Sequence, residues 1–148
     1  MLKSHLNQIK NKNKMRILTL IIIMTSFLNN FGNKPIKIEK IELRSVDFNI
    51  TSIIGVRCNN FENYFKEEVD TTWIYDRNII EDFVKSINAL KTDPMNYYPD
   101  VRAKLLFYKT NGKIDTLCMS NVGIVFNGKP MLMNNRLLKL VKQYQSLH

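Results

Sequence analysis

The residues best suited to do chemistry in this chain are three closely spaced acids. Glu67, Glu68 and Asp70 form the densest carboxylate cluster, and carboxylates can serve as general acid and base in hydrolysis. Their spacing argues against that use, because neighbouring residues of a strand point to opposite faces. Glu67 and Glu68 would then not converge on one substrate, so a small carboxylate-dependent hydrolase is the alternative interpretation and not the leading one.

Other catalytic machinery is missing from the sequence. His5 and His148 lie near the two ends of the chain, where no core would hold them. Ser-His-Asp and Cys-His nucleophiles and histidine-ligated zinc are therefore not expected. None of the five glycines is spaced to cradle a phosphate, and neither a Walker nor a dinucleotide-binding motif occurs. We expect no catalytic residue, no metal, no cofactor and no nucleotide.

The two cysteines, Cys58 and Cys118, each fall in a segment expected to be a strand. In an exported protein an even pair can form a disulfide. Closing a loop of about sixty residues would add roughly 4 kcal/mol in the chain-entropy model. The alternative is a pair of buried free thiols that act as small hydrophobes, and the sequence leaves both open.

A tyrosine-containing loop supplies the candidate binding residues. Tyr97 and Tyr98 stand in the loop 92–100, which two prolines stiffen, and tyrosines give a large contact area at low entropic cost. Arg102 and Lys104 follow on the next expected strand and would form a basic surface beside the loop. The alternatives are rings folded back onto the helix or sheet, and an ordinary solvated strand face.

The net charge is high, but much of it belongs to the N-terminal segment. The 148 residues carry 22 Lys and Arg against 13 Asp and Glu, a formal +9 that suggests an anionic partner. Residues 1–32 hold five of these bases and no acid, so the rest of the chain keeps about +4. We therefore expect no nucleic-acid partner. Acids concentrate in residues 62–82 and bases in 83–148, which leaves contact with a membrane surface as an alternative.

The first 32 residues have the layout of an export signal. Five bases precede a mostly apolar run over residues 17–28. That run is shorter than the roughly 20 residues of a transmembrane helix but fits the apolar region of a signal peptide. An Ala-x-Ala cleavage site is missing, so an uncleaved anchor is the alternative, and Met15 is an alternative start. We predict a signal or anchor over 1–32 and a single domain over 33–148 in the periplasm or cell envelope.

The apolar pattern predicts an α+β fold: an antiparallel hairpin meander with helices packed on one face. Two Asn-Gly pairs, at 111–112 and 127–128, indicate hairpin turns in which both residues have positive φ. Trp73 is expected in the core or at its edge. The expected strands are 34–48, with bulges or bends, then 51–58, 69–75, 101–108, 113–119, 122–126 and 129–133. The expected helices are 60–66, 76–91 and one that begins at Asn134 or Asn135.

Three C-terminal segments carry a resemblance to known proteins. Lys113–Met119, Gly123–Lys129 and Asn134–Val141 resemble small exported or lipid-anchored domains of unknown function from Bacteroidetes. The resemblance implies export and no particular activity, and the lipidation cysteine that many of these proteins carry is missing here. A helix followed by a four-stranded meander is also similar to one repeat of secreted β-lactamase-inhibitor-type folds, an analogy of fold that carries no function.

The export signal and the lack of a catalytic constellation favour a non-enzymatic module of the cell envelope. We expect it to bind another envelope protein. The alternatives are the hydrolase, which would act on envelope polymers, and a peripheral protein of the membrane surface.

Overall fold

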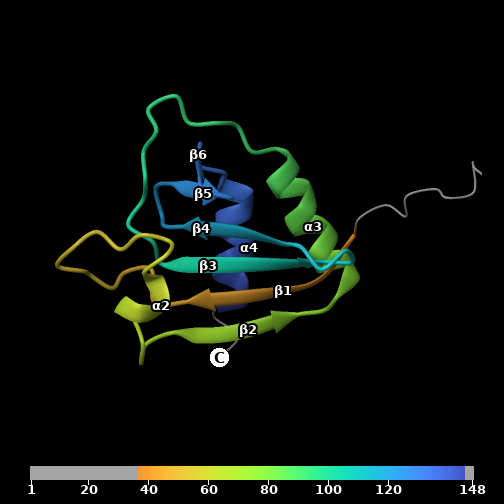
Figure 1. Cartoon of the computed structure of the whole chain (residues 1–148), viewed down its shortest axis with the longest axis horizontal. Coiled ribbons are helices and arrows are strands. Elements are labelled where there is room, and N and C mark those ends of the chain that lie inside the picture. The colour runs from red at the N-terminus through yellow and green to blue at the C-terminus, as the bar shows by residue number, and fades with distance from the viewer. Residues whose placement is uncertain (1–36, 146–148) are drawn as a thin grey trace, which may run out of the picture. The chain divides into compact units, whose positions relative to one another are not determined.

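The computed structural model describes residues 37–145, and an antiparallel sheet of six strands is at its centre (Figure 1). The strands are β1 Ile38–Ser45, β2 Asp70–Ile74, β3 Ala103–Lys109, β4 Ile114–Met119, β5 Ile124–Phe126 and β6 Lys129–Met131. Their order in the sheet is β2-β1-β3-β4-β5-β6. The expected meander therefore runs from β3 to β6, whereas β1 lies between β2 and β3. The signal or anchor predicted for residues 1–32 lies outside the described residues.

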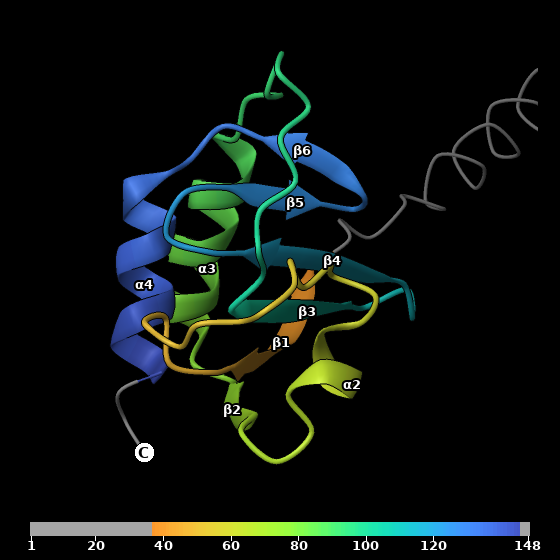
Figure 2. The same cartoon turned by 90° about the vertical axis from the view of Figure 1, so that its left-hand side faces the viewer.

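Two long helices cover one face of the sheet and a short one lies on the other. α3 Arg77–Asn88 and α4 Asn135–Gln145 pack side by side on the first face, and α2 Phe61–Tyr64 lies on the second (Figure 2). The predicted α+β fold is thus confirmed. Among the described residues, no helix combines the length and apolar character needed to cross a membrane.

Side-chain caps fix where the two long helices begin. The carboxylate of Asp76 accepts hydrogen bonds from the backbone N–H groups of Asn78, at 2.8 Å, and Ile79, at 3.2 Å. At α4, Oδ1 of Asn134 accepts one from the N–H of Leu137 at 3.0 Å. Before α2, by contrast, the side chain of Asn60 makes no capping hydrogen bond.

The main core fills the space between the sheet and the long helices. Alternate strand residues point into it, as the period of two requires, and the ring of Phe83 in α3 meets that of Phe107 in β3 edge-on. The fully buried members include Ile41, Leu43, Phe83, Leu105, Phe107, Leu117, Met119, Ile124, Leu137 and Val141. This packing fixes the register and leaves the opposite side chains of β1 to β4 on the second face.

A smaller core lies on the second face, beneath α2 and the loop that precedes it. Its buried members are Val46, Val56, Phe61, Phe65, Val101 and Cys118. The strand predicted over 51–58 is wrong. Val56 donates its N–H to the carboxylate of Asp100 at 2.7 Å, and its carbonyl accepts a hydrogen bond from the N–H of Val101 at 2.9 Å. The N–H of Val56 is therefore bonded to a side chain and not to the backbone of a neighbouring strand.

The two Asn-Gly turns differ from one another. Asn127 and Gly128 both have positive φ, at 47° and 79°, as expected. In the first turn only Gly112 has a positive φ, at 77°. The expectation that Asn111 also has a positive φ is therefore wrong. Its Oδ1 instead accepts a hydrogen bond from the N–H of Lys113 at 3.1 Å. The bulge expected in the first strand is confirmed by a shift of register between Ile38 and Lys40.

Candidate functional site

An aromatic patch occupies the part of the second face that α2 leaves open. It consists of Trp73 in β2, Tyr75 just after it and Tyr108 in β3. The rings of Trp73 and Tyr75 stack at 6.2 Å between centroids, and those of Trp73 and Tyr108 lie 5.8 Å apart. Trp73 is 40% exposed and Tyr75 64%. Trp73 packs against neither core, so the expectation that it lies in the core or at its edge is wrong.

Charged side chains of β1 hold this patch in place. The ammonium of Lys40 lies 4.3 Å from the ring centroid of Trp73 and 4.7 Å from that of Tyr108, within cation–π range. The hydroxyl of Tyr108 donates a hydrogen bond to Glu42 at 2.7 Å, and this bond raises the pKa of Tyr108. Glu42 is only 4% exposed and forms an ion pair with Arg44 at 2.6 Å. These contacts fix the orientation of the Trp73 and Tyr108 rings.

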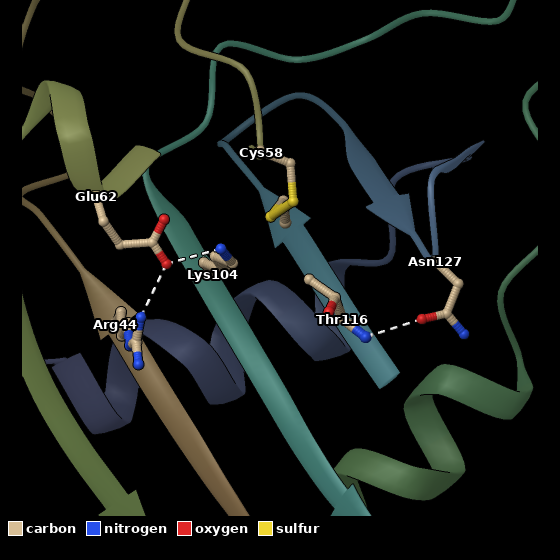
Figure 3. Close-up of a disulfide and its surroundings, with 7 residues drawn as sticks. Arg44, Cys58, Glu62, Lys104, Thr116 and Asn127 are labelled. Atoms are coloured by element: carbon tan, nitrogen blue, oxygen red, sulfur yellow. Dashed lines mark hydrogen bonds and ion pairs between the residues drawn. A yellow bond between two sulfur atoms is a disulfide. The ribbon is translucent and has the colours of Figure 1, made fainter. Parts of the chain in front are cut away.

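The candidate residue Lys104 belongs to a network that fastens α2 to the sheet. Its ammonium lies 2.7 Å from Oε1 of Glu62 in α2, and Arg44 in β1 reaches the same oxygen at 2.9 Å (Figure 3). The Lys104 side chain is only 16% exposed. Its charge is therefore used within the protein.

The candidate residue Arg102 is buried and does not project from the hairpin, so the expected basic surface is absent at this position. Its guanidinium donates to Asp100 at 2.6 Å, to the carbonyl of Ile50 at 3.0 Å and to the hydroxyl of Ser52 at 2.9 Å. Burial opposes the charge of Asp100, but its hydrogen bonds from Arg102, Val56 and Ser52 outweigh burial and hold its pKa below the usual value. Arg102 thus anchors the loop over the smaller core.

The tyrosine loop is partly folded onto the protein. Tyr97 and Tyr98 are each about half exposed, at 49% and 46%. The ring of Tyr97 lies over Gly123, and that of Tyr98 lies 5.3 Å from the guanidinium of Arg57. Tyr98 and Cys58 line a recess of about 350 Å³ together with Arg57. The structure therefore brings these two candidates together, whereas Arg102 and Lys104 do not line that recess.

Cys58 and Cys118 are joined in a disulfide, the first of the two alternatives that the sequence left open (Figure 3). Their Cα atoms lie 5.7 Å apart. The bond ties the loop before α2 to β4, at the centre of the smaller core. The disulfide thus holds the loop before α2 against the second face of the sheet.

Strand β2 forms an open edge of the sheet. Among the described residues it pairs only with β1. Lys109 in β3 donates its N–H to Lys113 at 2.9 Å, on the β4 side. In an antiparallel sheet, the backbone N–H and C=O groups of successive residues point alternately to the two sides of their strand. When this alternation is followed from β3 through β1 to β2, the backbone groups of Thr71 and Trp73 point away from β1. Within residues 37–145 neither of these outward groups has a hydrogen-bond partner.

The opposite edge of the sheet is covered. Thr92 forms a bridge to Met131 in β6, and Leu132 donates its N–H to the carbonyl of Lys91 at 2.8 Å. The free edge at β2 is therefore a local feature of this side of the molecule. Prediction from the sequence missed the free edge, because the alternation of Trp73 and Tyr75 with polar residues indicates a strand but not its place in the sheet.

The acidic cluster lies beside this open edge. Glu67, Glu68 and Asp70 are exposed, and in the described part of the chain none of them forms an ion pair or lines the recess beside Tyr98. Hydrolysis by two carboxylates needs them to flank one substrate, and the exposed placement of these three acids does not favour that use. Within residues 37–145 no three His, Cys, Asp or Glu side chains are grouped to hold a metal ion.

Comparison with protein-family models, with curated proteins and with solved structures found no match to this chain.

Proposed function

We propose that this chain is an exported protein of the cell envelope that acts as a non-enzymatic module and binds another protein along the free edge of β2. The observation that carries the proposal is the outward-facing backbone of Thr71 and Trp73, which lies next to the aromatic patch. An unpaired edge is a template for a further strand. Proteins that recognise extended segments use such edges, because main-chain hydrogen bonds supply affinity and side chains supply specificity.

The aromatic patch supports this use of the edge. An added strand would lie about 4.8 Å from β2, so alternate side chains of that strand would come close to Trp73 and Tyr75. Buried Trp and Tyr rings commonly dominate the energy of protein interfaces. Because Lys40 and Glu42 already hold the patch in place, few side chains would need to be ordered on binding.

The charge beside the edge favours a basic partner. Glu67 and Glu68 precede β2 and Asp70 begins it, and these exposed acids carry no internal counter-charge among the described residues. A partner segment with Lys or Arg would meet this end of β2. Such complementary charges raise association rates and set the orientation of binding.

Two observations support export. The basic and apolar layout of residues 1–32 fits a signal, and the Cys58–Cys118 disulfide fits an oxidising compartment such as the periplasm. Binding to a membrane surface has less support, because Arg102 and Lys104 are engaged inside the protein.

A proline substitution at the edge tests the proposal. Thr71→Pro removes an outward N–H without taking a bond from the β1 ladder, and edge strands tolerate proline. Thr71→Val is the matched control, because it keeps the N–H and the strand propensity. Trp73 is the single tryptophan, so its fluorescence reports directly on the edge.

The probes are two extended peptides, one alternating valine with lysine and one alternating valine with glutamate. We expect the lysine peptide to shift Trp73 fluorescence saturably in the wild type and in Thr71→Val, and to lose most of its affinity for Thr71→Pro. Cross-linking in envelope extracts should recover a partner with Thr71→Val and not with Thr71→Pro. Equal binding by the two variants, with both folded by circular dichroism, would refute the use of this edge.

A further inference from the structure

We infer that a second site, separate from the β2 edge, binds a single-chain amphiphile with an anionic head group. The site is a recess of about 650 Å³ between α3 and the sheet, where β1 and β4 begin and β3 ends. It lies on the face that the long helices cover, whereas the rings of the aromatic patch lie against Lys40 and Glu42 on the other face. The inference therefore does not depend on the proposed protein partner.

The walls of the recess are apolar and come from both layers of the fold. Val84 and Ile87 project from α3, and Ile38 and Phe126 from β1 and β5. These four side chains pack against the main core but are only partly buried. The recess is thus a place where the core is incompletely covered, and its volume lies within the about 300–1,000 Å³ typical of small-molecule sites. An alkyl chain is the kind of group that such walls would take up.

The mouth of the recess carries an excess of positive charge. Lys37, Arg77, Lys85 and Lys109 stand around it, against Glu81 and Asp115. Lys109 is paired with Asp115, and Lys85 with Asp82 at 3.7 Å. The exposed Glu81 is then set against two bases, Lys37 and Arg77. An anionic head group complements this mouth, and a cationic one would meet repulsion.

Arg77 is the residue best placed to receive the head group. Its Nη1 donates to the carbonyl of Ile38 at 2.7 Å, which holds the guanidinium between the start of α3 and the start of β1. A guanidinium has five N–H donors, so others stay available for a carboxylate or phosphate. The apolar walls and the fixed cation together specify a ligand with one apolar tail and one anionic end.

The test uses the full-length chain and four probes below their micelle concentrations. Decanoate and decyl phosphate share a tail and carry anionic heads of two kinds, which distinguishes a fatty acid from a phosphate-headed lipid. Decyltrimethylammonium reverses the head charge, and acetate lacks the tail. Amide chemical shifts in α3 and at the ends of β1, β3 and β4 locate the binding, and calorimetry gives its affinity.

We expect at least one anionic probe to bind saturably at these residues, while acetate and decyltrimethylammonium do not. Arg77→Glu should weaken binding of that probe about tenfold or more. The variant should stay folded, because an acid is favourable in the first turn of a helix. Val84→Trp should abolish binding by filling the recess. Lys139→Glu, which changes an exposed lysine of α4 away from the recess, should leave affinity unchanged.

Three results would overturn the inference. One is equal affinity for the cationic and anionic probes. Another is a map of shifts that avoids α3. The third is the absence of saturable binding by any decyl probe.

Discussion

Glu62 in α2 accepts a hydrogen bond from the ammonium of Lys104 in β3, with 2.7 Å between Oε1 and Nζ. Arg44 reaches the same oxygen. Burial alone would raise the pKa of Glu62, but the hydrogen bonds and charges of Lys104 and Arg44 outweigh it, and the pKa lies below the ordinary value of 4.5. The attachment of α2 to the sheet is therefore linked to pH.

Glu62→Gln should make the protein less stable in a manner that depends on pH. Because folding lowers this pKa, the unfolded chain binds the proton more readily than the folded one. The stability that the charged Glu62 contributes is therefore complete above about pH 5 and is lost as the pH falls through the folded pKa. We expect the variant to lose about 1–2 kcal/mol at pH 7. Urea unfolding should show the difference shrinking towards about pH 3. An equal difference at both pH values would contradict this, and Glu68→Gln is the exposed control.

Asp100→Asn should destabilise the loop that covers the smaller core. The substitution removes the counter-charge of Arg102, whose side chain is 7% exposed, and weakens the bond to the N–H of Val56. Leaving a buried charge unpaired costs about 3–5 kcal/mol, and the partial exposure of Asp100 lowers the expected loss to about 2–3 kcal/mol. Denaturant midpoints measure the loss, with the exposed Asp70→Asn as control. A loss below that of the control would show that Arg102 finds other partners.

Removing the disulfide should lower stability without changing the sheet. We expect the double variant Cys58→Ala with Cys118→Ala to lose about 2–5 kcal/mol, because the unfolded chain regains the freedom of a long loop. Equilibrium unfolding of the double variant, and of the wild type with and without reductant, gives the values. Reductant should move the midpoint of the wild type and leave that of the double variant where it is. A wild type unaffected by reductant would mean that the two sulfurs are not bonded in solution.

The sequence predicts the local part of this fold well. The hairpins from β3 to β6 follow from alternation and turn residues that lie within a few positions of one another, and α3 follows from its apolar stripe and from Asp76. The insertion of β1 between β2 and β3 depends on pairings between distant residues, such as Leu43 with Leu105. No local pattern encodes such a pairing, so the open edge at β2 could not be foreseen.

The same limit applies to the site residues. Tyr98 and Cys58 are recognisable by type, but their shared recess depends on how the loop folds over β4. Arg102 has the strand spacing of an exposed base. It is buried because Asp100 and, from about fifty positions earlier in the chain, Ile50 and Ser52 satisfy its guanidinium. Trp73 is exposed because α2 covers only part of the second face, which again is a matter of tertiary structure.

Gly123→Ala should show how firmly the tyrosine loop rests on the sheet. A Cβ at this position would lie 3.1 Å from Cδ1 of Tyr97 and 3.2 Å from Cβ of Pro99, closer than ordinary contact. The ring of Tyr97 is half exposed and can move, whereas Pro99 is buried. We expect a loss of about 1 kcal/mol from this overpacking, together with a more exposed Tyr97.

Thermal unfolding measures that loss, and the NMR shifts of the Tyr97 ring report its displacement. The partner variant Tyr97→Ala tests the cause, because it removes the atoms nearest to the new methyl group. If contact with Tyr97 is responsible, Gly123→Ala should cost less in the Tyr97→Ala background than in the wild type. An unchanged cost would place the clash at Pro99 instead.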